Sequence, residues 1–457
     1  MFRSLKVLVF FIAVLSLDSL FSQSEEFEPC GHRHVIEDLE SRFPGYKKEY
    51  DKMYQDIIRM SKSKTTSINK RKRRIKDTIY TYDTTIVIPV VFHILYSNTY
   101  ENVEDSLLVN QIEVLNQDFQ RQNPDTANTR SFFKSRAGSL KVKFVLADTD
   151  PNGNPTNGIN RVPTSVTSWG TSNGVNNNMK YTARGGVNSW DPDKYINVWV
   201  CDMTYGGTER VLGFAYPPNS HPFWTIRSLK AEQGVVIHYK CIGRNNRRAT
   251  TYLLRSSNMG RVATHEFGHY FGLRHIWADD QNLANRCFYD DFIDDTPKQG
   301  TGSNFSCDPQ RNTCTEANDL PDMIENYMDY STHPCQNMFT EQQTRAMQST
   351  LETYRSSIAT YEITTTTTVI DTVEYDEMLV FYRSDKSQII VEVVDKELDV
   401  TLSFDLFNIV GQKMMETVTI EKNETIIPAS KFSQGQYIAV LRTGDGDLVK
   451  VQRLIVN

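Results

Sequence analysis

The sequence predicts an α+β domain, built on a twisted mixed sheet and several helices, followed by a small all-β sandwich. In the first part of the chain, β-branched apolar segments such as Ile86–Tyr96 alternate with helical patterns, as expected when strands and helices share a core. After the threonine run Thr364–Thr368, helical periodicity disappears and short apolar segments are divided by turn signals such as Gly444–Gly446. This second pattern is typical of a β-sandwich.

The first domain is expected to hold buried strands at Ile86–Tyr96, Val142–Leu146 and Ile196–Val200. Between the first two, apolar residues spaced by 4, 3 and 4 positions predict a helix with one apolar stripe: Leu108, Ile112, Leu115 and Phe119. Near the end of the domain, Thr340 and Gln343 form a capping box that predicts the start of a last helix. Its expected apolar stripe is Met347, Leu351, Tyr354 and Ile358.

The second domain is expected to consist of six short strands: Ile389–Val394, Val400–Phe407, Lys413–Ile420, Thr425–Ile427, Tyr437–Leu441 and Leu448–Ile455. The threonine run before them marks a change in composition, so we interpret it as a linker or as the lead-in to a strand.

Export is predicted from the first residues of the chain. Residues 1–23 have a basic start and an apolar run, Val7–Leu17, that is too short to span a bilayer, which is typical of a cleaved signal peptide. No later segment approaches about 20 apolar residues, so no transmembrane segment is expected after signal removal. The net charge is -6 without an extended basic face, which argues against nucleic-acid binding. From Ser24 to about Asp77 the chain is polar, and its basic run Lys70–Arg74 is interpreted as a processing site.

One eleven-residue stretch indicates chemistry. His265 and His269 lie four apart, so on a helix both imidazoles can reach one metal ion, and Glu266 can take a proton from a water held there. Gly272 can adopt positive φ and turn the chain, so that His275 supplies a third ligand. Three nitrogens with an open fourth position are the arrangement of a single catalytic zinc. The competing interpretation is an amphipathic core helix with incidental histidines.

Seven cysteines in an exported chain predict three disulfides and one odd thiol. Four of them lie between the zinc helix and residue 335 and allow three pairings: Cys287, Cys307, Cys314 and Cys335. Cys201 and Cys241 follow strand-like segments and could pair with each other. Cys30 is then left over, either as a free thiol, as a partner for Cys201 or Cys241, or as a latency switch that blocks the open zinc position. His32 and His34 lie close to Cys30 in sequence and could play that blocking role instead.

The zinc stretch resembles the signature of metzincin metallopeptidases, and Asn326–Tyr330 (N-Y-M-D-Y) resembles the Met-turn of their pappalysin family. The resemblance spans about residues 86–358. It implies that Met328 forms an apolar floor under the ligands and that Tyr330 helps to stabilise the tetrahedral intermediate. It also implies the disulfides Cys287–Cys314 and Cys307–Cys335. Pro29-Cys30-Gly31 resembles the short Cys-Gly motifs of metzincin propeptides, which favours the latency switch.

The same resemblance implies two binding elements. In metzincins an edge strand before the zinc helix binds the substrate backbone in antiparallel fashion, and here that segment contains Gly213, Phe214 and Ala215. An ordinary edge strand closed by prolines is the alternative. Residues 290–297 hold four carboxylates within six positions, which usually form a solvated loop. The pattern also resembles a segment that binds structural calcium, with Asp291 and Thr296 as candidate ligands.

One segment departs from the family. Bacterial and archaeal relatives that cut beside Arg or Lys resemble each other in an acidic residue shortly after the Met-turn, at the base of the S1′ pocket. Here that segment is Ser331–Cys335, which has no carboxylate and contains His333. A basic preference, with self-cleavage at the basic run, is therefore not expected, and His333 would favour an acidic or neutral side chain.

The end of the chain resembles the C-terminal sorting domain of bacterial type IX secretion, on the segments Phe407–Gln412, Gly435–Tyr437 and Lys450–Val456. This implies export through the periplasm and across the outer membrane by the type IX machinery, with release or attachment at the cell surface. A plain accessory β-sandwich is the alternative.

Together these observations predict a signal peptide at 1–23, a propeptide at 24–78, a catalytic domain at 79–362, a linker at 363–376 and a sorting domain at 377–457. The expected function is that of a secreted zinc endopeptidase, made as a latent zymogen, that hydrolyses protein or peptide substrates. The competing hypothesis is a surface-anchored adhesin or binding module with a vestigial zinc site.

Overall fold

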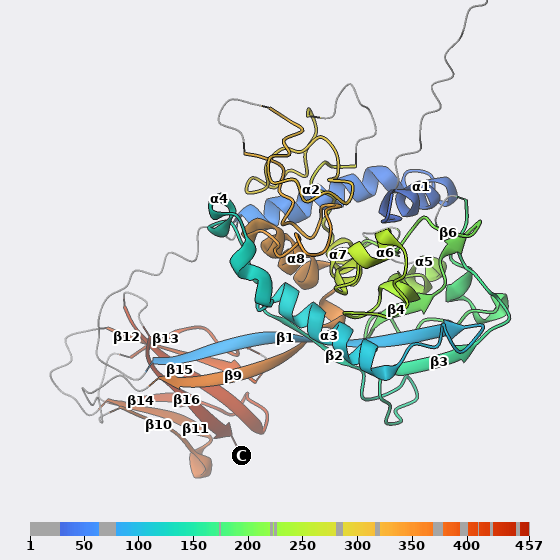
Figure 1. The fold of residues 1–457 in the computed structure, drawn as a ribbon. Helices are drawn as coiled ribbons and strands as arrows, with labels where there is room; N and C mark the ends of the chain where they lie inside the picture. Colours follow the sequence, from blue (N-terminus) through green and yellow to red (C-terminus); the bar gives the residue numbers. More distant parts are fainter. Residues whose placement is uncertain are drawn as a thin grey trace, which may run out of the picture.

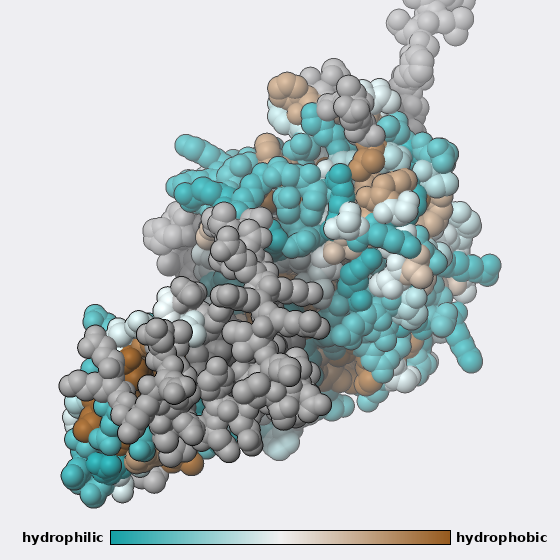
Figure 2. Space-filling model, turned by 90° about the vertical axis from the view of Figure 1, so that its left-hand side faces the viewer, coloured by the Kyte–Doolittle hydropathy of each residue, from teal (hydrophilic) through white to brown (hydrophobic). Residues whose placement is uncertain are grey.

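The computed structural model describes residues 28–63, 79–172, 175–219, 223, 226–279, 287–315, 320–368, 378–393, 401–409, 411–420, 424–444 and 448–456. The predicted signal peptide and basic run lie outside these residues. The described helices include none that combines the length and the apolar character needed to cross a membrane. On the face shown in Figure 2, hydrophilic residues cover most of the described surface and hydrophobic ones form small separate groups.

A seven-stranded mixed sheet organises the larger domain, as predicted. The long strand β1 (Ile79–Tyr96) pairs in parallel with β2 (Val142–Leu146), β3 (Ile159–Pro163) and β4 (Ile196–Cys201). β8 (Val235–His238) is parallel to β4, and β7 (Gly213–Ala215) is antiparallel to β8 at the edge of the sheet. A separate two-stranded ribbon joins β5 (Thr204–Tyr205) and β6 (Thr208–Glu209).

The helices α3 (Asp105–Phe119), α7 (Arg261–Tyr270) and α8 (Glu341–Thr353) share one hydrophobic core with this sheet. Shorter helices are α4 (Ser131–Lys134), α5 (Arg227–Ala231) and α6 (Tyr252–Ser256). Phe119 joins the layers, since its ring lies 5.2 Å from that of Phe144 on β2 and 6.5 Å from that of Phe267 on α7. The predicted capping box at Thr340 and Gln343 is present at the start of α8.

Two helices lie in the segment that the sequence presents only as polar: α1 (His32–Arg42) and α2 (Tyr46–Ser63). One face of α2 is buried in the core of the larger domain, with residues at helical spacing: Tyr46, Tyr50, Met53, Tyr54, Ile57 and Ile58. The charged residues between them mask this stripe in a composition-based view. In Figure 1, α1 and α2 lie along the side of the domain that carries α7.

The threonine run is not a linker, which corrects the predicted segment 363–376 where it is described. Residues Thr360–Thr368 form β9, which pairs antiparallel with the first half of β1, from Thr360 opposite Val87 to Thr368 opposite Ile79. Threonine is β-branched and favours extended backbone, and the N-terminal half of β1 supplies a pairing partner. The rest of the predicted linker lies outside the described residues.

The C-terminal part forms two facing antiparallel sheets around their own core, as predicted. One contains β10 (Met378–Arg383), β11 (Gln388–Val393) and β14 (Glu424–Pro428). The other contains β12 (Leu402–Asn408), β13 (Val418–Ile420), β15 (Gly435–Thr443) and β16 (Leu448–Val456). The sequence analysis missed β10 and made β13 too long, because the chain crosses from β12 to β13 through a turn closed by the Phe407–Lys413 bridge.

The cysteines confirm one expectation and correct another. Cys287–Cys314 and Cys307–Cys335 are disulfide-bonded, as the family resemblance implied. Cys201 and Cys241 are not bonded to each other; both are buried free thiols. Cys201 ends β4 and its sulfur lies 3.8 Å from that of Met203, whereas Cys241 lies in a 3₁₀ turn after β8. Both cysteine side chains are buried in the core, where they pack like small hydrophobic residues.

Candidate active site

The three predicted histidine ligands meet at one point. His265 and His269 lie on α7, and the helix ends at Tyr270, where Gly272 with φ of 89° reverses the chain toward His275. The Nε2 atoms of His265 and His269 are 3.2 Å apart, and the Nε2 atom of His275 is 3.1 Å from each of them. All three side chains are buried.

A second layer of groups fixes the orientation of each ring. The Nδ1 atom of His265 donates to the carbonyl oxygen of Tyr327 at 2.6 Å, and that of His269 donates to the carbonyl oxygen of Leu273 at 2.8 Å. The Nδ1 atom of His275 pairs with the carboxylate of Asp279. Because each Nδ1 carries the proton, each Nε2 directs a lone pair to the common point.

This donor set fits zinc. Burial, together with the neighbouring His275, lowers the pKa of His265 to about 3, so its ring is neutral. Three neutral imidazole nitrogens at about 3 Å separation repel one another unless a cation lies between them. Neutral imidazoles that donate their second nitrogen to an oxygen are the usual zinc ligands of proteins.

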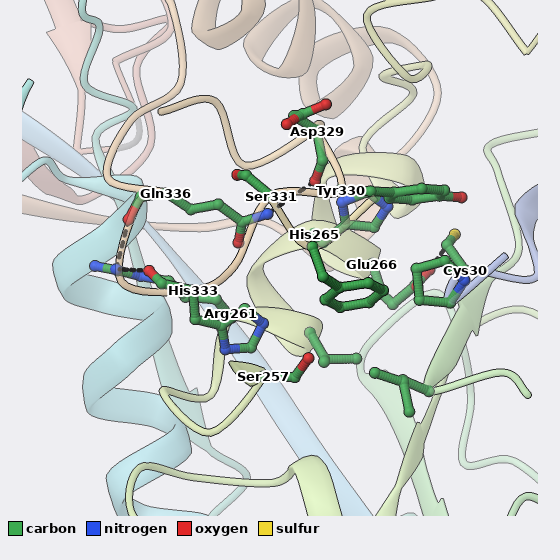
Figure 3. Close-up of a pocket in the computed structure, with 14 residues that line it drawn as sticks. Cys30, Ser257, Arg261, His265, Glu266, Asp329, Tyr330, Ser331, His333 and Gln336 are labelled. Atoms are coloured by element: carbon green, nitrogen blue, oxygen red, sulfur yellow. Dashed lines mark hydrogen bonds between the residues drawn. The ribbon is translucent and has the colours of Figure 1, made fainter. Parts of the chain in front are cut away.

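Cys30 lies at the same point, brought there by the segment before α1. Its sulfur and the three Nε2 atoms lie within 4.8 Å of one another. The thiol lies 3.5 Å from the Oε2 atom of Glu266 and accepts from the backbone N–H of His32 at 3.4 Å. Figure 3 shows Cys30 facing Glu266 on the open side of α7. Burial raises the pKa of Glu266 to about 8 in this closed state.

His32 and His34, the alternative blocking residues, do not reach the common point. The His32 ring stacks on the His269 ring with centroids 3.9 Å apart, and its Nε2 atom lies 3.1 Å from the Tyr50 hydroxyl. His34 pairs instead with carboxylates of the same segment, Glu28 and Glu37. His32 therefore covers a ligand, a contact that the sequence analysis did not foresee.

The edge strand β7 lies directly beside Glu266. A Cβ atom on Gly213 would be 2.9 Å from the Cγ atom of Glu266 and 3.0 Å from the carbonyl oxygen of Val236, so only glycine fits there. Phe214 and Ala215 are fully buried, so this strand can offer a ligand only its backbone. On its outer side, Leu212 N–H donates to the carbonyl of Pro29 at 2.7 Å, and Gly31 N–H donates to the carbonyl of Gly213 at 2.9 Å.

Met328 lies beneath the helix, at Gly268, the residue before His269. A Cβ atom on Gly268 would be 2.4 Å from the Met328 sulfur, so the thioether occupies the space that a larger residue would need. Tyr330 borders the ligands: its ring centroid lies 4.8 Å from that of His275 and 5.7 Å from that of His265. Both residues therefore lie close to the three histidines or to the helix that carries them.

Arg261 holds these parts together and was missed by the sequence analysis. Its buried guanidinium lies 3.3 Å from Asp118 on α3 and 2.6 Å from Asp125, and it donates to the carbonyl oxygen of His333 at 2.8 Å. Tyr327 of the Met-turn donates to the same Asp118 at 2.8 Å. One charge network therefore connects α3, the start of α7 and the segment after the Met-turn. The sequence signal that could have pointed to this network is a charged residue, Arg261, at the start of an otherwise apolar helix.

A pocket opens along the face of α7 that carries His265 and Glu266, between the helix and the segment after the Met-turn (Figure 3). Its lining includes Ser257, Val262, His333 and Gln336. The Nδ1 atom of His333 accepts from Met259 N–H at 3.1 Å. Asp329 is also in the lining. Its Oδ1 atom accepts from Gln299 at 2.6 Å and from the Ser303 N–H at 3.0 Å, whereas its Oδ2 atom is buried and has no hydrogen-bond partner among the described residues.

The candidate calcium residues lie together in the loop after the zinc ligands. Asp291 is buried, and its Oδ1 atom accepts from the Thr296 hydroxyl at 2.8 Å and from the Ile293 N–H at 3.2 Å. Its Oδ2 atom is buried and has no hydrogen-bond partner among the described residues. Burial raises the pKa of Asp291 well above its usual range, with the charge of Asp290 as a further cause.

The chain was compared with known proteins. The family Peptidase_M43, described as pregnancy-associated plasma protein-A, matches residues 180–352. Mature mirolysin of Tannerella forsythia, solved with a cleaved peptide, is 39% identical, with 60% of this chain and 95% of that chain covered and a TM-score of 0.52. A promirolysin variant of the same organism is 35% identical, with coverage of 72% and 97% and a TM-score of 0.58. An extracellular metalloprotease of Arthroderma gypseum is 27% identical over 264 residues, which are 58% of this chain and 71% of that protein.

The contact between Gly268 and Met328 gives a prediction about the zinc ligands. Gly268→Ala places a methyl group against the Met328 sulfur, so the helix or the Met-turn must shift, at a cost of about 1–3 kcal/mol. We expect a lower thermal midpoint and zinc binding weakened by roughly 10–100-fold, measured by competition with a chelator. Adding Met328→Ala should recover part of the loss. Unchanged zinc affinity in Gly268→Ala would contradict the role given to this contact.

Proposed function

This chain belongs to the Peptidase_M43 family and is a metalloendopeptidase. We propose that it is made as a latent zymogen in which the Cys30 sulfur occupies the fourth zinc position, and that Glu266 is the general base. The observation that carries this proposal is the meeting of four potential ligands, three histidines and a cysteine, beside one buried glutamate. An adhesin with a vestigial site, the competing hypothesis, needs neither the glutamate nor a blocking thiol.

The residues of the site divide the work of peptide hydrolysis. When bound, zinc supplies a Lewis acid that polarises the scissile carbonyl and lowers the pKa of water. Glu266 is placed to take a proton from the attacking water and to pass it to the leaving amine. The Tyr330 hydroxyl is assigned to the oxyanion that develops on the carbonyl, and the backbone of β7 to the substrate chain.

Latency follows from the direction of the N-terminal segment. Residues 29–31 run parallel to β7, whereas a substrate in this family is expected to run antiparallel. The segment therefore uses the hydrogen bonds of the substrate site in the reverse direction, and it presents a thiol rather than a peptide carbonyl to the zinc ligands. α1 and α2 add the burial that holds it there.

The pocket along α7 is proposed to accept the side chain after the scissile bond. The segment Ser331–Cys335 contributes no carboxylate to its lining, which also includes the guanidinium of Arg261 and the polar side chains of His333 and Gln336. Burial lowers the pKa of His333 well below its usual range, so its ring is neutral. A neutral or acidic side chain fits this lining better than a basic one.

We also propose a structural calcium at Asp291. A buried carboxylate with one unpartnered oxygen is costly unless a cation or a proton compensates it, and oxygen ligands at short spacing suit calcium. The Thr296 hydroxyl and neighbouring backbone carbonyls are the other candidate ligands.

The C-terminal sandwich is proposed to be a sorting domain for type IX secretion, and the mature enzyme to be released from the cell or attached to its surface. The relatives named extracellular metalloproteases support secretion. Removing residues 377–457 should then leave the chain inside the cell, as measured by immunoblotting of medium and cell fractions. Normal export of the shortened chain would favour a plain accessory domain.

Glu266→Ala should abolish hydrolysis without loss of zinc. We expect casein cleavage by the processed enzyme to fall by about 10²–10⁴-fold, because the general base is missing. Bound zinc, measured by mass spectrometry, should stay at one ion per chain, since the three histidines are intact. Glu113→Gln, on an exposed position of α3, is the matched control. Hydrolysis at the normal rate in Glu266→Ala would exclude this mechanism.

Cys30→Ala should make the unprocessed chain leaky. The thiol no longer covers the ligands, although α1 and α2 still obstruct the cleft, so we expect measurable casein hydrolysis before processing. The unprocessed chain with Cys30 intact should show none. After processing, both proteins should have equal activity. Equal latency of the two unprocessed proteins would show that obstruction alone, and not the thiol, blocks the site.

Asp291→Asn should remove the response to calcium. Millimolar calcium is expected to raise the thermal midpoint of the unaltered chain, because an ion that binds the folded state stabilises it. The variant should show little change. Asp290→Asn, at the adjacent, partly buried residue, is the control and should keep the response. A calcium effect of equal size in Asp291→Asn would place the ion elsewhere or exclude it.

A further inference from the structure

A charged contact links the N-terminal helices to the rest of the chain at some distance from the zinc ligands. Arg42, the last residue of α1, donates to the carboxylate of Glu232 from both terminal nitrogens, Nη1 at 3.0 Å and Nη2 at 2.7 Å. The same guanidinium donates to the Tyr216 hydroxyl at 3.2 Å. A two-nitrogen contact of this kind is the preferred geometry between arginine and a carboxylate.

Glu232 is a buried, hydrogen-bonded residue rather than a surface residue. Its side chain is only 2% exposed, and it also accepts from the Tyr181 hydroxyl. Lys180 lies close by, but its ammonium donates to the backbone carbonyl of Glu232 at 2.7 Å and lies 3.7 Å from the centroid of the Tyr216 ring. Among the described residues, Arg42 is therefore the only cation that pairs with the carboxylate itself.

The other charged contacts of the N-terminal helices differ from this one. Lys62 pairs with Asp294, whose side chain is 65% exposed, and Arg274 pairs with Asp51, whose side chain is 49% exposed. The exposed Asp294 carboxylate therefore loses little when Lys62 leaves. In the second pair it is the carboxylate that leaves with α2, and Arg274, whose side chain is 12% exposed, stays in the larger domain. Glu232, in contrast, would lose Arg42 as its paired cation after removal of α1 and would remain beside the hydroxyls of Tyr181 and Tyr216.

The position of Glu232 and Tyr216 along the cleft can be measured from β7. Tyr216 directly follows the strand, and its N–H donates to the carbonyl of Gly234 at 3.0 Å, so the inner pairing continues past Ala215. From Gly213, beside Glu266, to Tyr216 the extended chain covers about 10 Å. An antiparallel substrate would place there a residue that precedes the scissile bond by roughly three to five positions.

We infer that Glu232, with the hydroxyls of Tyr216 and Tyr181, forms a substrate subsite for a guanidinium or ammonium side chain on the N-terminal side of the scissile bond. In the zymogen Arg42 fills this subsite, and removal of the N-terminal helices frees it. The inference rests on the proposed function, because it assigns a direction to the substrate. It gives the enzyme a basic preference on the side of the cleft opposite the pocket lined by His333.

The experiment uses the full chain after limited trypsin digestion at the basic run and removal of the released propeptide by gel filtration. Quenched fluorogenic peptides of one neutral parent sequence carry arginine, or uncharged citrulline, at each of the second to sixth positions before the scissile bond. Mass spectrometry locates the cleaved bond. The enzymes compared are the unaltered protein, Glu232→Gln, Tyr216→Phe and the surface control Glu113→Gln.

At one position, arginine should raise kcat/KM by roughly tenfold or more over citrulline in the unaltered enzyme, as expected of a charge-assisted pair. Glu232→Gln should lose this preference, Tyr216→Phe should reduce it, and Glu113→Gln should keep it. The surface control Glu113→Gln should cleave the neutral parent peptide at the unaltered rate, and equal thermal midpoints and zinc contents of the four proteins would show that the variants are folded.

A flat arginine scan in an enzyme that cleaves the parent peptide would overturn the subsite, and so would a preference that persists in Glu232→Gln. Failure of the unaltered enzyme to cleave any peptide would instead contradict the proposed function. If Glu232→Gln loses cleavage of the parent peptide, Tyr216→Phe decides, and an undiminished preference in that variant would exclude the site.

Discussion

Three imidazole lone pairs that converge on one buried point are the constraint on which the rest of this structure depends. The Nε2 atoms lie 3.1–3.2 Å apart, and without a cation their mutual repulsion would separate them. The protein opposes that repulsion with outward hydrogen bonds from each Nδ1 atom and with close packing of Met328 against Gly268. Arg261 then ties the base of the helix to α3 and to the Met-turn through the buried charge of Asp118.

The N-terminal segment uses the same features that a substrate would need. It pairs with the outer edge of β7, directs a thiol toward the zinc ligands and places an arginine on the buried Glu232. Each of these contacts would be freed on processing. In the proposed zymogen, inhibition and substrate binding would depend on one set of backbone groups and side chains, and the opposite chain direction would separate the two states.

The meeting of the three histidines could be predicted from the sequence, because their spacing brings them together at the end of one helix. The two disulfides could be predicted because a family resemblance implied their pairing. The sandwich could also be predicted, since its alternation of apolar residues and turns is local. The helices α1 and α2 were missed, because the apolar stripe of α2 is hidden among charged residues. The threonine run was interpreted as a linker or as the lead-in to a strand rather than as a paired strand, because its partner in β1 lies about 280 residues away in sequence.

Contacts between distant segments set the same limit at the site. Arg261 and Asp118 are 143 positions apart, and Arg42 and Glu232 are 190 apart, so neither pair has a local signature. The suggested Cys201–Cys241 pair failed for a related reason, since strand-like flanks do not say which way two side chains point.

X-ray absorption at the zinc edge tests the central claim most directly. In the unprocessed chain loaded with one zinc ion, the account predicts three nitrogen neighbours and one sulfur at about 2.3 Å, the distance of a zinc–thiolate bond. After removal of the propeptide the sulfur should disappear, leaving only nitrogen and oxygen. The absence of sulfur around zinc in the unprocessed chain, with Cys30 reduced, would contradict the assignment of Cys30 as the blocking ligand.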